Sequence, residues 1–310
     1  MKNLSTRSNS RIIYLSIGSM LLGVLFIDIY GIIIKFLGDT YSTNQVVLFR
    51  NLFAIIPLLT LIFFTNENLD IFKKITKKFL ILCSIRGLCF LFMNVFYFIA
   101  INNMDFATAS TLTFSATFFI VILSIFFLND RVGIYRWSAV IMGFVGVAMI
   151  LKPTSDVFSY YSVYPLMVGF LYAIAIIVLK FIPKNNSTAK IQFYSLIASI
   201  IGAIILLVIT LDNIVIKSYN DLLMLVSIGI LGGSAGILFI YAYRLIEASK
   251  LAVFEYLAIP SSFFLGWFFF DEAPIDQLFP GVFGIILAGM IIIWRDKKKK
   301  KTFKVSKKVY

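Results

Sequence analysis

The chain has 310 residues, of which 60% are hydrophobic and 14% are charged. Its mean hydropathy of +0.96 lies far above that of soluble domains, so the composition argues against a soluble fold. The net charge is +13, histidine is absent and there are two cysteines. Zinc, haem and iron–sulfur sites mostly need histidine or thiolate ligands, so we expect no metal and no cofactor. Without histidine, an enzyme would have to use a carboxylate mechanism around Asp28 or Glu255, and we expect no catalytic residues.

Ten apolar stretches follow one another along the chain, separated by short polar connections. A helix needs about 20 apolar residues to cross the hydrocarbon core of a bilayer. Strands of a membrane barrel would instead alternate polar and apolar residues over about 10 positions. The sequence therefore predicts an all-α membrane protein. The predicted membrane-spanning helices cover residues 12–35, 44–64, 79–101, 106–128, 134–151, 160–182, 191–211, 222–245, 250–270 and 278–294.

Lysine and arginine gather on one side of this predicted bundle. If ten helices alternate in direction, the N-terminal tail (1–11), the basic C-terminal tail (295–310) and the most basic connections share that side. The opposite connections carry mainly acidic residues. The positive-inside rule then predicts a multi-pass protein of the inner membrane with both termini cytoplasmic. The positive charge indicates the lipid bilayer, not nucleic acid, as its partner.

The two halves of the chain, 12–151 and 160–294, carry similar patterns in the same order. The matching segments are separated by about 141 to 145 residues, which indicates an internal repeat. Because each half holds five helices, the second half enters the membrane upside down relative to the first. Such inverted repeats are typical of secondary transporters, whose substrate site lies near the midplane between the repeats. The matching pairs are 30–36 with 175–181, 49–54 with 193–198, 126–130 with 268–272, and Gly143 and Ala148 with Gly284 and Gly289.

Segments of both halves resemble a known family. The run 108–132, the pair Arg136 and Trp137, and the run 143–153 resemble the end of an EamA repeat, as does 248–273 in the second half. The resemblance places the chain in the drug/metabolite transporter superfamily and implies ten helices in a 5+5 inverted repeat. Within that superfamily, the runs 48–54 and 86–88 look most like those of bacterial S-adenosylmethionine uptake carriers.

Four charged residues fall inside predicted spans, where each must face a cavity, a partner or the headgroups. Asp28 and Arg50 lie about equally far from the turn near Asp39, so they are predicted at similar depth and could form an ion pair. This pair is either a structural clamp or a gate or substrate anchor, since the guanidinium fork of arginine suits a carboxylate or phosphate.

Arg86 and Glu255 both begin helices on the predicted cytoplasmic side and could pair across the two repeats. Arg86 is shallow enough to reach the headgroups instead. Glu255 is the sharper candidate, because burial disfavours its ionised form and a proton-coupled carrier needs such a carboxyl. Alternatively, Glu255 is a structural carboxylate whose hydrogen bonds to neighbouring helices are all formed.

Pro260 is predicted to kink its helix and to free the carbonyl group of Tyr256 beside Glu255. Other polar and aromatic side chains within the spans are candidates for the lining of a central cavity. These candidates are Asn94, Tyr97, Thr113, Phe114, Tyr241 and Tyr256. Most polar groups of this kind form bonds between helices, while aromatic rings that face a cavity could stack on a planar or cationic ligand.

We therefore expect a carrier, not an enzyme, that moves a small organic metabolite by alternating access. We favour the uptake of a cofactor-like compound, and S-adenosylmethionine is the first candidate substrate. Riboflavin and amino acids are alternative substrates, and export of a metabolite or drug is an alternative direction. Energy could come from protons or from exchange against an internal metabolite, and the protein could be a monomer or a homodimer. A channel would need a continuous polar stripe, which no span shows; a lipid flippase is the remaining alternative.

Overall fold

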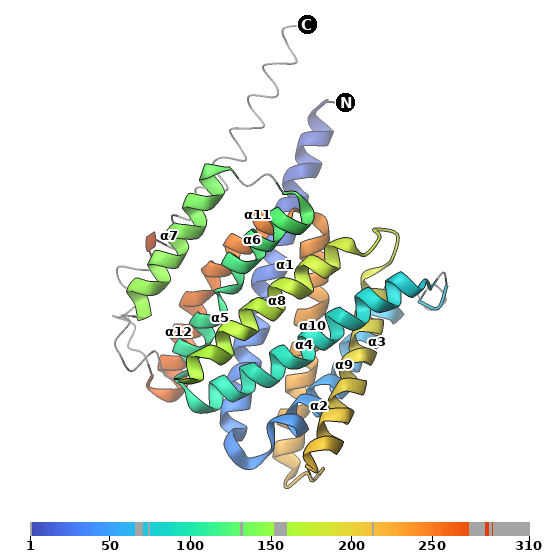
Figure 1. Cartoon of the computed structure of the whole chain (residues 1–310), viewed down its shortest axis with the longest axis vertical. Coiled ribbons are helices and arrows are strands. Elements are labelled where there is room, and N and C mark those ends of the chain that lie inside the picture. Colours follow the sequence, from blue (N-terminus) through green and yellow to red (C-terminus); the bar gives the residue numbers. More distant parts are fainter. Residues whose placement is uncertain are drawn as a thin grey trace, which may run out of the picture.

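The computed structural model describes residues 2–65, 71–73, 75–130, 133–151, 160–212, 214–272, 283, 284 and 287. Within these ranges every regular element is a helix, which confirms the all-α prediction (Figure 1). The elements are α1 (Lys2–Leu37), η1 (Gly38–Thr40), α2 (Thr43–Phe53), α3 (Ile55–Thr65), α4 (Lys77–Asn103), α5 (Phe106–Thr113), α6 (Ala116–Leu128), α7 (Ile134–Leu151), η2 (Tyr160–Ser162), α8 (Val163–Phe181), α9 (Thr188–Thr210), α10 (Tyr219–Leu245), α11 (Ala248–Leu251), η3 (Ala252–Ala258) and α12 (Ile259–Phe270).

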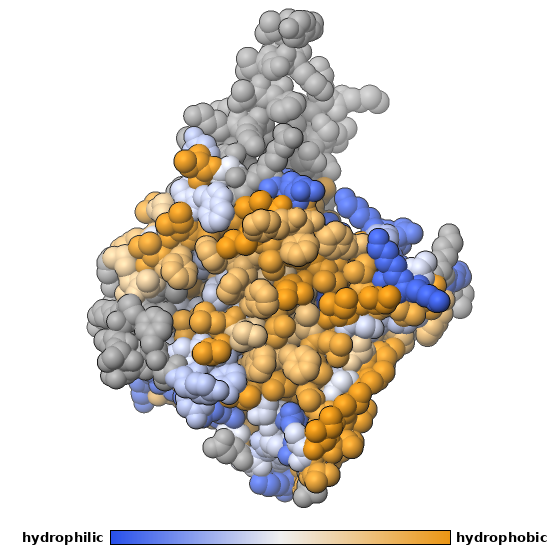
Figure 2. Space-filling model, in the orientation of Figure 1, coloured by the Kyte–Doolittle hydropathy of each residue, from blue (hydrophilic) through white to orange (hydrophobic). Residues whose placement is uncertain are grey.

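In the part of the chain that the structure describes, seven helical segments are long and apolar enough to cross a membrane. The bounds of each segment lie within a few residues of those of the corresponding predicted span. Two shorter apolar helices fall within the predicted spans 134–151 and 250–270. The predicted span 278–294 and the tail 295–310 lie outside the residues that the structure describes. Apolar side chains cover the middle of the molecular face in Figure 2, and the most hydrophilic side chains lie towards its edges. The protein is thus a multi-pass membrane protein.

Three of the nine predicted spans that the structure describes are interrupted. The second breaks at Ala54 into α2 and α3, because Pro57 cannot donate its backbone bond and crowds the turn before it. The fourth breaks at Phe114 and Ser115, where the backbone makes short 3₁₀-type bonds. The ninth changes into a 3₁₀-helix just before Pro260, where the sequence predicts a kink. In contrast, α1 is longer than its predicted span, since the helix already begins in the predicted N-terminal tail.

The interruptions of the fourth and ninth spans are equivalent in the predicted repeat. Their helices also end in the same way, because Asn129 after α6 and Asp271 after α12 both have φ of 52°, in the left-handed region. Asparagine and aspartate adopt this conformation more readily than other side chains. The residue that follows each of them is a carboxylate, so the same turn presents Asp130 at one end of the bundle and Glu272 at the other.

The helices of the two halves pack against each other in reciprocal pairs. Helix α1 packs on α10 and α4 packs on α8; α4 packs on α9, and α10 on α2 and α3 (Figure 1). The interrupted segments follow the same rule, because α5 and α6 contact α8 while η3 and α12 contact α1. Close approach depends on glycine: a Cβ atom on Gly87 would meet the backbone of Ser195, and one on Gly232 would meet the side chain of Arg50.

Candidate functional site

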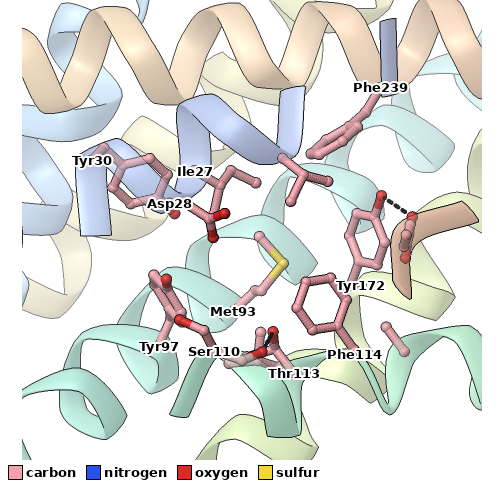
Figure 3. A pocket seen from close by; sticks show the side chains of 14 residues that line it. Ile27, Asp28, Tyr30, Met93, Tyr97, Ser110, Thr113, Phe114, Tyr172 and Phe239 are labelled. Atoms are coloured by element: carbon pink, nitrogen blue, oxygen red, sulfur yellow. Dashed lines mark hydrogen bonds between the residues drawn. The ribbon is translucent and has the colours of Figure 1, made fainter. Parts of the chain in front are cut away.

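A cavity of about 80 Å³ lies inside the bundle, between the interrupted segments (Figure 3). Its walls come from α1, α4, α5, α6, α8, α10 and η3, so both halves of the chain contribute. Three of the predicted lining residues, Tyr97, Thr113 and Phe114, lie there, as do the carboxyl groups of Asp28 and Glu255. The remaining walls include Val24, Ile27, Tyr30, Met93, Ser110, Ala116, Val168, Tyr172 and Phe239.

Asp28 reaches the cavity from α1 and is only 2% exposed. Its carboxylate accepts a hydrogen bond from Ser261 Oγ in α12 at 2.5 Å, so it joins the first helix to the ninth predicted span. The expected ion pair with Arg50 is wrong, because Arg50 instead donates to Asn51 and to the carbonyl oxygen of Gly232. Similar depth along a hairpin does not fix which way each side chain points around its own helix axis.

Glu255 reaches the same cavity from η3 and is 3% exposed. Its Oε1 accepts hydrogen bonds from two phenol groups, Tyr172 of α8 at 3.0 Å and Tyr243 of α10 at 2.5 Å; Figure 3 draws the first. The expected pair with Arg86 is not formed, and the carboxylate bonds to the two tyrosines instead. A buried carboxyl held by two hydroxyl donors can bind a cation or exchange a proton, since no lysine or arginine of the described cavity walls neutralises it.

Arg50 and Arg86 lie beside a second, smaller cavity of about 20 Å³. Arg50 donates to Asn51 Oδ1 at 3.0 Å and to the carbonyl oxygen of Gly232 at 3.1 Å. The guanidinium of Arg86 lies over the ring of Phe90, with 4.6 Å between Cζ and the ring centroid. Arg86 is only 1% exposed, so it does not extend to the headgroups as one reading of the sequence suggested.

The other predicted lining residues lie elsewhere. Asn94 is not in the cavity wall: it donates to the carbonyl oxygen of Phe90 in its own helix at 2.7 Å and accepts from the hydroxyl group of Tyr30 in α1 at 3.5 Å. Tyr241 is 40% exposed and therefore faces away from the interior. Tyr256 is buried, and its ring fills the space beside Gly143 in α7.

The kink at Pro260 does not leave the carbonyl group of Tyr256 free. At the end of the 3₁₀-helix before the proline, the backbone N–H of Ile259 donates a hydrogen bond to the carbonyl oxygen of Tyr256. The loss of one α-helical bond is thus compensated by a tighter turn, which is the usual way in which a helix end satisfies its backbone groups.

The sequence analysis missed the partners of both cavity carboxyls. Tyr172, Tyr243 and Ser261 are single hydroxyl groups within long apolar spans, and nothing in their spacing sets them apart. One usable signal was present: Tyr172 precedes the matched segment 175–181, as Tyr30 opens its partner segment 30–36, and both line the cavity.

Polar clusters of related composition lie at the two ends of the bundle. At the end where α1 finishes, Lys35 forms an ion pair with Glu272, whose other carboxylate oxygen accepts the backbone N–H of Phe106 at 2.7 Å. We term these three residues the Lys35 cluster. They connect the ends of α1 and α12 to the start of α5.

The opposite end contains the repeat equivalents, Lys180 and Asp130, which with Ser249 we term the Lys180 cluster. Lys180 donates to the carbonyl oxygen of Ile246, and Asp130 accepts from Ser249 Oγ at 2.9 Å. Lysine and carboxylate are therefore not ion-paired here. A cavity of about 580 Å³ lies at this end, and both Lys180 and Asp130 line it.

Comparison with known proteins, like the cavity inside the helix bundle, indicates a transporter. Residues 14–152 match the EamA-like transporter family. The chain carries an EamA-like transporter domain. It is 27% identical to the S-adenosylmethionine uptake transporter of Rickettsia bellii, over 92% of this chain and 95% of that protein. It is also 27% identical to the riboflavin transporter of Vibrio cholerae, over 61% and 63%, and to the pseudopaline exporter of Pseudomonas aeruginosa, over 87% and 93%.

A solved protein structure with 16% identity superposes with a TM-score of 0.66 over 94% of this chain and 98% of that one, which supports the fold alone. The EamA-like domain and the transporter names of the relatives indicate a transporter and not an enzyme.

Proposed function

We propose that the protein is a secondary transporter that moves a small organic metabolite across the inner membrane by alternating access. Two inverted five-helix repeats, 12–151 and 160–294, would enclose its substrate. The central cavity is the observation that carries this proposal, because both halves line it at equivalent helix interruptions. Secondary transporters bind their substrates near the midplane at discontinuous helices of this kind. The positive-inside distribution of charge supports cytoplasmic termini.

Reciprocal packing supports the inverted repeat. The most extensive contacts between the two halves come in pairs with the roles exchanged, as with α1 on α10 and α4 on α8. The left-handed residues Asn129 and Asp271 end equivalent helices. A two-fold relation between the repeats accounts for both facts, whereas unrelated halves would have no reason to share them.

The two polar clusters suggest how access alternates. The ion pair of the Lys35 cluster holds one end of the bundle closed, while at the Lys180 cluster the lysine and the carboxylate stay apart beside a cavity. We infer that the pairing exchanges: when Lys180 meets Asp130, Lys35 releases Glu272. Binding of substrate would favour whichever state makes the better contacts with it.

The chemistry of the central cavity favours a cationic, partly planar substrate. Two carboxyl groups, Asp28 and Glu255, provide negative charge, and aromatic rings such as Tyr97 and Phe114 provide stacking surfaces. S-adenosylmethionine combines a sulfonium, an ammonium and an adenine, and several relatives are named for its uptake. The present volume of about 80 Å³ lies below the roughly 300 Å³ at which ligand pockets begin, so the cavity would widen on binding.

Riboflavin and amino acids are alternative substrates, and export is an alternative direction, because relatives include riboflavin transporters and an exporter. Energy would come from protons through Glu255 or from exchange against an internal metabolite. A channel or a lipid flippase would differ in kinetics, because only a solute carrier shows saturable uptake that unlabelled solute competes away.

The substrate ranking is tested with purified protein in detergent and in proteoliposomes. S-adenosylmethionine should raise the unfolding temperature more than riboflavin does at equal concentration, and labelled S-adenosylmethionine should enter proteoliposomes saturably. A larger shift with riboflavin would reverse the ranking. Uptake that never saturates would argue against a carrier.

A further inference from the structure

Several hydrogen-bond donors around the second cavity have no partner in the structure. Nε of Arg50, Nε and Nη2 of Arg86, and Nδ2 of Asn51 are all buried and unbonded, and so is Oγ of Ser199. All four residues line the same cavity of about 20 Å³. Buried polar groups are nearly always hydrogen-bonded, so a cluster of unbonded donors at one point needs an explanation.

The two guanidinium groups also lack a counter-charge. Within the part of the chain that the structure describes, no carboxylate is ion-paired with either of them, since Asp28 and Glu255 bond to hydroxyl groups instead. Each arginine is at least nine-tenths buried. A buried charge without an opposite charge is strongly disfavoured, because it has lost its hydration without compensation. A neutral water molecule could satisfy the N–H groups but would leave the two positive charges in place.

The site adjoins the central cavity across one layer of rings. The guanidinium of Arg86 lies over Phe90, and the ring of Phe90 contacts Tyr172 edge to face, with 6.4 Å between centroids. Tyr172 in turn lines the central cavity and donates to Glu255. The bundle interior thus holds negative and positive groups side by side, as a zwitterionic ligand would require.

We propose that Arg50, Arg86 and Asn51 form a binding site for an anionic group. Guanidinium groups bind carboxylates and related anions through charge-assisted hydrogen bonds, and the unbonded N–H groups supply the donors. A free anion such as chloride is close in size to the present cavity. The carboxylate of a transported solute needs the cavity to widen, and this second source rests on the proposed function. The binding chemistry is the same in both cases.

The experiment measures the unfolding temperature of the purified protein in detergent. Sodium chloride and sodium acetate are titrated separately, and S-adenosylmethionine is compared with its decarboxylated analogue. The variant Arg86→Gln removes one guanidinium, and Lys184→Gln, at an exposed lysine, removes the same charge elsewhere. Comparing variants in identical buffers separates binding from general salt effects.

We expect chloride or acetate to stabilise the wild type by about 2–4 °C at ten times its dissociation constant, and Arg86→Gln by less than half of that. Lys184→Gln should respond as the wild type does. If the occupant is the substrate carboxylate, the analogue should bind at least about tenfold more weakly than S-adenosylmethionine to the wild type, and equally to Arg86→Gln.

The proposal is overturned if the wild type responds to neither salt and does not discriminate against the analogue. An equal response of wild type and Arg86→Gln would place the binding elsewhere and overturn it too. Failure of S-adenosylmethionine to bind would count against the proposed substrate, whereas the salt titrations would still decide the anion site. If Arg86→Gln does not fold, Arg50→Lys takes its place and is judged by the same comparison with the wild type.

Discussion

The two ends of the bundle carry related residues in different arrangements. At one end Lys35 and Glu272 are ion-paired and the backbone of Phe106 is bonded to the same carboxylate. At the other end Lys180 bonds to a backbone carbonyl group and Asp130 to Ser249, beside a cavity. Residues that are equivalent in sequence therefore do not have equivalent partners. The difference shows that residues equivalent in the predicted repeat are paired at one end of the bundle and unpaired at the other.

The largest expected effect concerns the carboxyl that the second half places in the central cavity. Glu255→Gln keeps an oxygen that can accept from Tyr172 and Tyr243 but cannot take up or release a proton. Accumulation driven by a pH gradient in proteoliposomes should fall to the level of protein-free vesicles, while exchange of labelled for unlabelled S-adenosylmethionine should persist.

Asp28→Asn is the matched variant in the first half, because it removes the other carboxyl of the cavity. We expect it to weaken binding without separating accumulation from exchange. Unchanged accumulation by Glu255→Gln would remove the proton role, and the energy would then come from exchange.

The second prediction compares the two clusters directly. Glu272→Gln breaks an ion pair and weakens the hydrogen bond from Phe106, so the Lys35 end should open more often. Loss of a partly exposed ion pair together with a charged hydrogen bond should raise the population of the state that is open at this end by about five- to tenfold. The measurement is labelling of an introduced cysteine, Ser110→Cys, by a membrane-impermeant thiol reagent, in a background without Cys83 and Cys89.

Asp130→Asn should change that labelling by less than about twofold, because in this state Asp130 has no ion pair to lose. Asp271→Asn is the control beside Glu272: asparagine already occupies the equivalent left-handed position 129. Equal labelling of Glu272→Gln and Asp130→Asn would mean that the two clusters do not differ in function.

The smallest effect is expected at the helix contacts that the two halves share. A Cβ atom on Gly87 would meet the backbone of Ser195, whereas one on Gly232 would meet the flexible side chain of Arg50. Gly87→Ala should therefore lower the unfolding temperature by about 2–4 °C, and Gly232→Ala by less. Gly18→Ala, with open space around it, should be neutral or stabilising. A larger loss at Gly232 would mean that the position of Arg50 is fixed more rigidly than its side chain suggests.

Much of the fold was predictable, because an apolar run of sufficient length has few alternatives in a bilayer. The seven long segments agree with the predicted spans to within a few residues. Pro260 also indicated an interruption correctly. The break at Phe114 and Ser115 could not be predicted, since it has no proline and depends on contacts with α8, where Gly169 leaves room for Ser115.

Site residues were predicted in part. Asp28 and Glu255 were identified because a carboxyl group in an apolar span requires either a functional role or a polar partner. Both residues line the central cavity. Their partners were not predicted, because depth in the membrane follows from sequence position whereas the direction of a side chain follows from packing. The same uncertainty led to the exposed Tyr241 being assigned to the interior.

The separation of the two clusters has a consequence for the cell that hosts this protein. Lys35 and Glu272 share no residue with Lys180 and Asp130, so a single substitution would remove only one of the two closures proposed above. A chain that carries both Glu272→Gln and Asp130→Asn would hold neither barrier firmly. We expect such a chain to leak ions through the membrane, which a proteoliposome assay of ion flux would detect. In the proposed cycle, the separate positions of the two clusters therefore keep the loss of one closure from becoming the loss of both.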